Sequence, residues 1–430
     1  MIETIEGFLN LEEDVYQSNA IKYTKYQDHF ALDSQLNNDS DFNIYTQNID
    51  GLLLLQDSVL IMDVEMKKAA GDFADADAIS LTHNGPMYLF GKIKLELDQL
   101  VVEEFNHPGI ATTVAGLCKY DNGFSETVGR KQCWVVDAAS GTATTATNKG
   151  FNARKRMLLD NNTTKGTCRF VIPFSHISDF KGKIITGIKA ILSFSRTPRN
   201  NDALFKTDAT GGTAVDDGVL KITRLCWRIP YINLNLEAQL RVEKILRSKP
   251  VISFKYIQKT VQVQALPTSN NYSWNLSTYT TFNKITGIVV VFQTDQNNNQ
   301  TKNASLFKHC DVTDMKCSLN LIEYPGIALN CGYDSGLFME SYDRYVNFRG
   351  LFTSGLPEIS EEDFKNLYPL YCFDLSHQET RVSGQSLNVI IDMKFKQNVA
   401  ANTNVYAIVF TEKVVTLSTE GDNKMRVINH

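Results

Sequence analysis

Apolar and polar residues alternate with a period of two along much of the chain, which places one set of side chains on a buried face and the other toward solvent. Ile93, Leu95 and Leu97 alternate with charged neighbours over residues 92–98. Residues 168–174 repeat this alternation around further apolar positions. The sequence therefore predicts a mainly β protein with half-buried strands.

The second half of the chain carries two stronger strand signals. Residues 287–292 form a continuous apolar run, which predicts a deeply buried strand that is covered on both faces. Residues 387–395 alternate again, and residues 405–410 return as another strand after a polar turn at 398–404. We expect these last two strands to form a hairpin.

One segment near the middle of the chain has helical spacing. Asn235 is suited to cap a helix, and Leu236 and Leu240 are followed by apolar residues at 245 and 246. Pro250 blocks continuation of the helix. We expect a short amphipathic helix over residues 236–246, with these two leucines on its apolar face.

The strand-like segments fall into two groups of about eight, one on each side of this helix, without an exact sequence repeat. Two tandem eight-stranded sandwiches fit this pattern. The jelly roll is a leading candidate for each, although alternation alone does not separate it from immunoglobulin-like topologies. The predicted divisions are an N-terminal arm (1–45), a first jelly roll (46–235), a linking helix (236–250) and a second jelly roll (251–430).

Two further segments differ from the strands. Ile2, Ile5 and Phe8 lie at helical spacing, and most of the first 40 residues are too polar to join a sandwich core. We expect an arm that packs on a neighbouring subunit or stays disordered. Residues 138–149 are small and polar, which predicts a mobile loop at the end of a sandwich.

Composition adds limits on the class of protein. The 430 residues include 43% hydrophobic and 21% charged residues, which is typical of a folded chain with a sizeable core. The net charge is -5 and neither end carries a basic block, so direct sequence-specific nucleic-acid binding is not expected. Residues 154–156 read Arg-Lys-Arg, which we interpret as a solvated loop or strand edge and not as a nuclear signal.

The chain shows neither a secretory signal nor an apolar run long enough for a transmembrane segment. We therefore expect a soluble protein that is made inside the cell. Eight cysteines are scattered without the spacing of a disulfide scaffold, which predicts that most are reduced and buried.

The sequence contains none of the phosphate-loop, nucleophile-elbow, zinc-protease or dinucleotide motifs. The most tempting catalytic cluster is Cys372, Asp374, Ser376 and His377. On a strand the first three share a face and His377 points away, so the segment does not assemble a triad by itself. We interpret it as a strand end that enters a loop.

Three other sets of residues suggest chemistry but have simpler structural interpretations. His309, Cys310, Cys317 and Cys331 lack the spacing of a zinc site, so buried thiols are favoured and no cofactor or metal is expected. A sugar-stacking platform could be formed by Trp134, Trp227 and Trp274, but packing in the core is favoured for these rings. A glycosidase carboxylate pair could be formed by Glu103-Glu104 or Glu361-Glu362, but a charged rim is favoured for these side chains.

Many short blocks, in this order, resemble the double jelly-roll major capsid proteins of DNA viruses and the capsid-like proteins of invertebrate genomes, in particular the Polinton and adintovirus groups. The resemblance covers residues of about 80–425. The blocks are 84–90 (NGPMYLF), 106–113 (NHPGIATT), 132–134 (QCW), 148–154 (NKGFNAR), 170–176 (FVIPFSH), 227–230 (WRIP), 292–295 (FQTD) with the following 303–310, and 367–376 (LYPLYCFDLS).

The resemblance implies a structural protein of the virion, made in the host cytoplasm and assembled there or in the nucleus. It implies a homotrimer that forms a pseudo-hexagonal capsomer of an icosahedral shell, in contact with other capsomers and with penton or minor capsid proteins. It supplies no catalytic, cofactor or metal residue, and the interface residues stay unknown. A carbohydrate-binding jelly roll, a jelly-roll hydrolase and a capsid-derived protein retained by a host are the alternatives.

Overall fold

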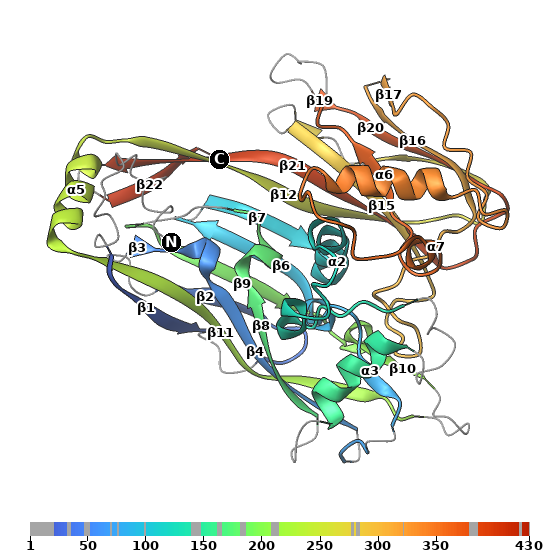
Figure 1. Cartoon of the computed structure of the whole chain (residues 1–430), viewed down its shortest axis with the longest axis horizontal. Helices are drawn as coiled ribbons and strands as arrows, with labels where there is room; N and C mark the ends of the chain where they lie inside the picture. The colour runs from blue at the N-terminus through green and yellow to red at the C-terminus, as the bar shows by residue number, and fades with distance from the viewer. Residues whose placement is uncertain are drawn as a thin grey trace.

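The structure is a computed structural model, shown in Figure 1. It describes residues 21–31, 36–46, 52–68, 71–74, 77–98, 100–138, 148–160, 166–180, 186–207, 215–276, 279–280, 284–320, 322–377, 386–420 and 424–429.

The first half of the chain folds into two antiparallel four-stranded sheets. In order across the first sheet the strands are β1 (Ile21–Phe30), β11 (Gly218–Leu234), β4 (Val59–Lys68) and β8 (Thr167–Pro173). In the second sheet they are β2 (Asp41–Tyr45), β9 (Ala190–Arg196), β6 (Phe90–Leu97) and β7 (Leu100–Asn106). The short β3 (Leu52–Leu53) adds to β11, and β5 (Ile79–Leu81) pairs with β10 (Leu204–Lys206).

The second half repeats this arrangement. Its first sheet contains β12 (Val251–Ala265), β21 (Thr403–Glu420), β15 (Lys284–Thr294) and β18 (Tyr371–Asp374). Its second sheet contains β13 (Asn271–Asn275), β20 (Val389–Phe395), β16 (Val312–Leu319) and β17 (Ile322–Tyr324). Outside these sheets' main order, β22 (Lys424–Asn429) pairs with β21, and β14 (Tyr279–Thr280) pairs with β19 (Ser386–Leu387).

The eight main strands of each half follow one topology. Numbered along the chain, the first, eighth, third and sixth strands form one sheet, and the second, seventh, fourth and fifth form the other, in both halves. This is the strand order of a jelly roll, built from antiparallel strands that cross between two facing sheets. The predicted double jelly roll is therefore confirmed.

The core follows the alternation of the sequence. Ile93, Leu95 and Leu97 of β6 point inward and are buried, while their charged neighbours are half-buried. Every residue from Ile288 to Phe292 in β15 is fully buried, as the continuous apolar run predicts. β15 lies between β21 and β18 in its sheet, so its edges are covered as well as its faces.

The expected hairpin of the last two long strands is wrong. β20 pairs with β13 and β16, whereas β21 pairs with β12, β15 and β22 in the opposite sheet. The turn at residues 398–402 therefore carries the chain across the sandwich. Both strands have one apolar face. Because the strands lie in opposite sheets, each face is buried toward the other sheet of the sandwich.

Helices lie mainly in the connection between the fifth and sixth strands of each jelly roll. In the first jelly roll this connection holds α2 (Pro108–Lys119), η4 (Val128–Gln132), α3 (Lys149–Lys155) and the π-helical turn η6 (Arg156–Asp160). In the second it holds α6 (Met339–Arg349) and α7 (Glu361–Asn366). Further helical segments among the described residues are η2 (Leu55–Asp57), η3 (Gly85–Leu89), α4 (Phe174–Ile177) and η7 (Asn201–Ala203).

The linking helix α5 (Leu236–Arg247) is present, but its buried face differs from the prediction. The side chain of Asn235 accepts a hydrogen bond from the backbone N–H of Ala238, which is the expected cap. Leu236 and Leu240 are exposed, and the buried residues are Ala238, Val242 and Leu246. Spacing of four residues places the latter three on one stripe, which is the stripe that packs inward.

The described part of the expected N-terminal arm belongs to the first jelly roll. β1 pairs with β11 along its length and β2 pairs with β9, so residues 21–30 and 41–45 are sheet strands. Their polar composition misled the prediction because β1 lies at a sheet edge, where one side of the strand faces solvent. The helix expected near Ile2 to Phe8 and the loop residues 139–147 lie outside the described residues.

Candidate functional site

The cluster with the strongest catalytic appearance is dispersed by the fold. Cys372 is buried in β18, whereas Asp374 and His377 are exposed. Ser376 donates its hydroxyl and its backbone N–H to Asp374 at 2.6 and 2.9 Å, which closes a local turn. Burial raises the pKa of the Cys372 thiol, so it lacks the thiolate character of a nucleophile.

The histidine and cysteines considered for metal binding have other surroundings in the structure. His309 stacks on Tyr333 with 4.3 Å between ring centroids, and its Nδ1 accepts a hydrogen bond from the backbone N–H of Asp311. Burial raises the pKa of Cys310 and Cys317 to about 12 and that of Cys331 to about 11. Among the described residues, no group of three or more metal-ligating side chains occurs. All eight cysteines are free thiols and six are buried, as predicted.

The three tryptophans are core residues, as the sequence favoured. Trp227 donates its ring N–H to Ser58 at 2.9 Å inside the first jelly roll. Trp274 is buried in the second. Trp134 packs against Gly116 of α2 so closely that a Cβ on this glycine would lie 2.1 Å from the ring. None of the three offers an exposed ring face for a sugar.

The paired carboxylates have unrelated surroundings. Glu103 of β7 is buried, and Glu104 points to the opposite face and pairs with Lys92. Glu361 and Glu362 are not on a strand: they form the exposed first turn of α7, where carboxylates favourably face the helix N-terminus. Neither pair has the facing geometry that glycoside hydrolysis needs.

One residue of the basic stretch at 154–156, Arg154, carries a buried charge. Arg154 was expected in a solvated loop or strand edge, but its side chain is fully buried on the inner face of α3. Its guanidinium binds Asp137 through two hydrogen bonds of 2.8 and 3.1 Å, and its Nε donates to the carbonyl of Leu81 at 2.8 Å. A buried charge persists only with such partners.

Two side chains of the second jelly roll contact this ion pair of the first. Asn303 of the second jelly roll donates its side-chain amide to Asp137 at 2.9 Å. The backbone N–H of Asp137 donates to the hydroxyl of Tyr368, also of the second jelly roll, at 3.0 Å. We call Asp137, Arg154, Asn303 and Tyr368 the junction cluster.

Other polar side chains cross the same junction beside this cluster. Glu358 accepts a hydrogen bond of 2.7 Å from the Trp134 ring N–H, and burial raises its pKa. Tyr345 of α6 donates its hydroxyl to the carbonyl of Leu117 in α2 at 2.8 Å. Gln300 donates to and accepts from the backbone of Gly218, both at 2.8 Å. Such paired groups fix orientation, because each loses a partner if the domains shift.

Two edge strands meet along the junction, β7 of the first jelly roll and β12 of the second (Figure 1). Lys259 of β12 forms a buried ion pair with Glu103 at 3.2 Å, donates to the carbonyl of Ile177, and lies 4.6 Å above the Phe105 ring centroid. Tyr256 donates its hydroxyl to the carbonyl of Val102 at 2.5 Å. The two jelly rolls are therefore fixed side by side.

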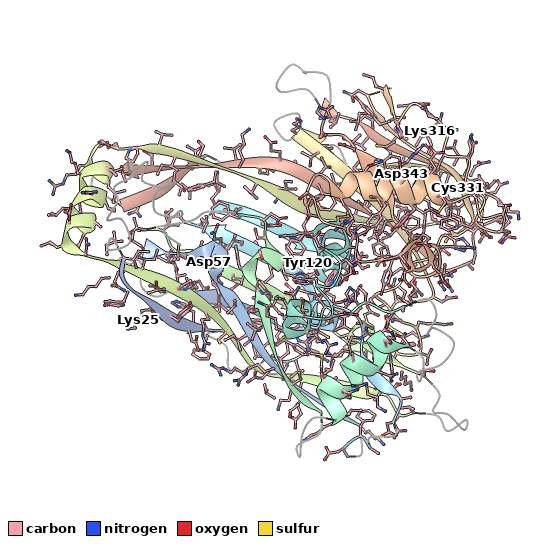
Figure 2. All side chains as sticks on the ribbon, in the orientation of Figure 1. Lys25, Asp57, Tyr120, Lys316, Cys331 and Asp343 are labelled. Carbon is pink, nitrogen blue, oxygen red and sulfur yellow. The ribbon has the colours of Figure 1, made fainter. Side chains whose placement is uncertain are left out.

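A buried aromatic and histidine group supports the junction from the first jelly roll, around Tyr120 (Figure 2). His176 Nε2 lies 3.0 Å from the Asn84 side-chain oxygen, and its Nδ1 lies 2.8 Å from the Tyr120 hydroxyl. Neutral imidazole satisfies both contacts, with Nε2 donating and Nδ1 accepting. Burial, together with the charges of Lys259 and Lys119, lowers the pKa of His176 to about 3.

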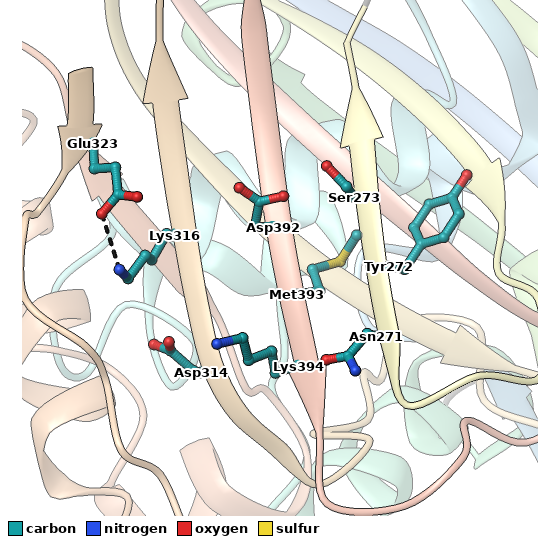
Figure 3. A pocket seen from close by; sticks show the side chains of 9 residues that line it. All are labelled: Asn271, Tyr272, Ser273, Asp314, Lys316, Glu323, Asp392, Met393 and Lys394. Carbon is teal, nitrogen blue, oxygen red and sulfur yellow. Dashed lines mark hydrogen bonds and ion pairs between the residues drawn. The ribbon is translucent and has the colours of Figure 1, made fainter. Parts of the chain in front are cut away.

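The outer face of the sheet that contains β13, β20, β16 and β17 is hollowed, with a cavity volume of about 460 Å³ (Figure 3). Lys316 pairs with Glu323 at 2.9 Å across its floor, beside Asp314, Asp392 and Lys394. Tyr272 supplies the one aromatic ring of this lining. The hollow is therefore a charged sheet surface and not an aromatic sugar platform.

Among the described residues, no helix is long and apolar enough to cross a membrane. A family model of the double jelly roll-like domain matches residues 79–415, which is most of the chain. The chain belongs to this family. No curated protein matches it.

Solved structures show the same fold for this double jelly roll-like chain. A chain in the cryo-EM structure of the Sputnik virophage aligns with a TM-score of 0.64 and 10% identity, covering 98% of this chain and 91% of that one. The capsid of the virus PBCV-1 aligns with a TM-score of 0.59 and 10% identity, covering 97% of this chain and 99% of that one. The mavirus major capsid protein gives 0.56 and 12%, covering 97% and 91%.

Sequence reasoning missed the junction cluster of this double jelly roll-like chain and the Glu103–Lys259 pair. A signal existed for one member: Asp137 directly follows an apolar run, residues 133–136, where a lone carboxylate needs a buried partner. Its partners Asn303 and Tyr368 lie more than 160 residues away in the chain. A single sequence does not reveal such pairing.

Proposed function

We propose that this protein is a viral major capsid protein that forms homotrimeric, pseudo-hexagonal capsomers of an icosahedral shell. One observation carries the proposal: a single chain presents the same eight-stranded jelly roll twice, fixed side by side by a buried polar junction. Two equivalent units per chain allow three chains to supply six similar positions around a ring.

The buried junction supports a building block of fixed shape. A binding protein with two independent domains needs no buried ion pairs between them, and domain motion is the default where an interface is small and polar. Here Lys259 and Arg154 are both buried in paired, hydrogen-bonded positions. Opening the junction would separate Lys259 from Glu103 and remove Asn303 from Asp137, which is costly for buried charges.

The domain limits, partners and location belong to the same proposal. The first jelly roll ends near residue 235, the linking segment is 236–250, and the second jelly roll is 251–430. The partners are further copies of the chain, other capsomers, and penton or minor capsid proteins. The protein is made in the host cytoplasm, resides in the virion and catalyses no reaction. The similar structures named above come from a virophage, a virus capsid and a major capsid protein, which supports this proposal.

Light scattering on the purified chain, followed by negative-stain imaging of the same sample, tests the proposal. We expect a stable trimer of about 145 kDa, three times the chain mass of 48.4 kDa, or shell-like particles. A strict monomer at high concentration contradicts the proposal. A glycan array on that monomer would then test the carbohydrate-binding alternative.

A further inference from the structure

The contact between β7 and β12, here called the template, joins edge strands of the two jelly rolls within one chain. β12 is the first strand of its jelly roll and β7 is the fifth strand of the other, and both stand at the edge of a sheet. Where they meet, the first-strand residues Tyr256 and Lys259 are buried, and so are the fifth-strand residues Val102 and Glu103. The junction is thus a contact of a first strand with a fifth strand.

Each jelly roll has a first and a fifth strand, so among the described residues this contact leaves one first strand and one fifth strand that take no part in it. The unmatched first strand is β1, where Tyr23, Tyr26 and Phe30 are 51, 61 and 51% exposed. The unmatched fifth strand is β17, where Ile322 is 42% exposed. The equivalent strands are covered where they meet, at Tyr256 and Lys259 of β12 and at Val102 and Glu103 of β7, although β12 exposes Val251 and Val263 nearer its ends.

Exposed apolar surface concentrates at these two places. Of fifteen large hydrophobic side chains exposed among the described residues, three belong to β1 and five to β17 and the connection that follows it. Exposed apolar groups gathered in this way mark interaction surfaces. The five are Ile322, Ile327, Leu337, Met339 and Leu356.

The charges on β1 and β17 have the same signs as those on the first and fifth strands of the template. At the junction the first strand supplies a lysine, Lys259, and the fifth strand supplies a glutamate, Glu103. Similarly, β1 exposes Lys25 to solvent (Figure 2), and β17 carries the exposed Glu323. Glu323 contacts Lys316 in the chain, but both side chains are partly exposed and can exchange partners (Figure 3).

We propose that β1 of one copy docks against β17 and residues 325–356 of a second copy, in a head-to-tail contact that repeats the β7–β12 junction. Figure 1 shows β1 and β17 at opposite ends of the molecule, so they meet only between chains. A heterologous contact of this kind closes into a ring when the rotation fits. The inference rests on the proposed homotrimer and names its interface.

The test uses one aspartate substitution in each surface of the full chain. Tyr26→Asp alters the β1 surface and Ile327→Asp alters the β17 surface. Val219→Asp is the control, because Val219 is also exposed, at 52%, on another strand of the first jelly roll. We expect each surface variant to be monomeric, with association weakened at least about 30-fold, and the control to form trimers as the unaltered chain does.

Mixing the two surface variants provides the decisive measurement. Each retains the half that the other lacks, so an equimolar mixture forms one intact contact and stops at a heterodimer, which light scattering detects. This result also shows that both variants are folded. A mixture that stays monomeric while the unaltered chain is trimeric overturns the inference, and so do variants that still form trimers; in either case the proposed capsomer survives. A monomeric unaltered chain overturns both proposals.

Discussion

The two jelly rolls share a strand order but differ in what covers their edges. The fifth strand of the first, β7, is buried at Val102, whereas Ile322 on the fifth strand of the second, β17, is exposed. The first strands show the reverse, because Tyr256 on β12 is buried and Tyr26 on β1 is exposed. The difference teaches that topology sets the arrangement within a sandwich, while the side chains of edge strands decide which edges meet.

The helical connections differ in the same sense. α2 of the first jelly roll is buried along most of its length against β6 and β7 of one sheet, Trp134 and α6. α6 of the second buries the side that faces α2, while Met339 at its start is exposed. The connection of the first jelly roll thus serves the junction inside the chain, and part of the second one is left for another contact.

The largest expected effect comes from breaking the cluster that joins the two jelly rolls. Arg154→Ala removes the cation from Asp137 and leaves a buried carboxylate without its charge partner. We expect a loss of about 3–5 kcal/mol in the free energy of unfolding, measured by urea titration. Arg169→Ala is the matched control, since Arg169 also forms a two-hydrogen-bond pair, with Asp63, but is exposed.

The control should change stability by less than about 1 kcal/mol, because solvent screens an exposed ion pair. Equal effects of the two substitutions would show that the junction contributes no more than a surface contact. In that case the Arg154–Asp137 pair would not be a firm anchor for Asn303 and Tyr368 of the second jelly roll.

The second prediction tests the covered and the bare fifth strand directly. Val102→Ala on β7 should destabilise the chain by about 2 kcal/mol, because it removes two buried methyl groups and leaves a small cavity. Ile322→Ala on β17 should change the stability of the isolated chain by less than about 0.5 kcal/mol. Thermal unfolding of both variants, in dilute monomer, measures the difference, and similar losses would contradict the contrast between the edges.

The sequence was sufficient for the strands and insufficient for their pairing. Alternation placed β6 and β15 correctly because burial on one or both faces is a local property of the side chains. It failed at β20 and β21, since a strand that crosses to the opposite sheet has the same pattern as one that returns in a hairpin. It also failed at β1, where an edge position makes a strand look too polar for a core.

The junction was beyond prediction for a different reason. Arg154 was expected to be solvated, and no pattern in the sequence singles out Lys259, because each meets its carboxylate only after the chain has folded. The catalytic interpretation of residues 372–377 was set aside on local geometry alone; in the structure Cys372 is buried in β18, while Asp374 and Ser376 form the turn at its end. The linking helix was placed correctly by its cap, but the choice of buried stripe depends on contacts with the rest of the fold.

The third prediction concerns the loss of stability in acid. We expect the first jelly roll to lose more than the second, because it contains His176. The pKa of this side chain is about 3 in the folded chain and near 6.5 in the unfolded chain, so below pH 6.5 the unfolded chain binds the additional proton. Stability is therefore full above pH 6.5 and falls as the pH is lowered. His176 alone should lower the free energy of unfolding by about 2 kcal/mol at pH 5.

Urea titrations between pH 7.5 and pH 5 measure this slope. His176→Gln removes the titrating group but keeps polar atoms at the site, so its stability should depend less steeply on pH even if it is lower throughout. An unchanged slope in this variant would show that His176 is not the acid-sensitive group. The second jelly roll offers an internal comparison, because His309 is less buried and stacks on Tyr333 at its surface.

A small effect is expected at the exposed stripe of the helix between the two jelly rolls. Leu240→Ser replaces an exposed leucine of α5 and should change stability by less than about 0.5 kcal/mol. Leu246→Ala, on the stripe that faces inward, should cost about 2–3 kcal/mol. Thermal unfolding of the two variants in dilute monomer shows which stripe of the helix contributes more to stability. If Leu240→Ser were the more damaging, the buried face would be the one that the sequence spacing favoured, and the helix would pack on the jelly rolls in the opposite orientation.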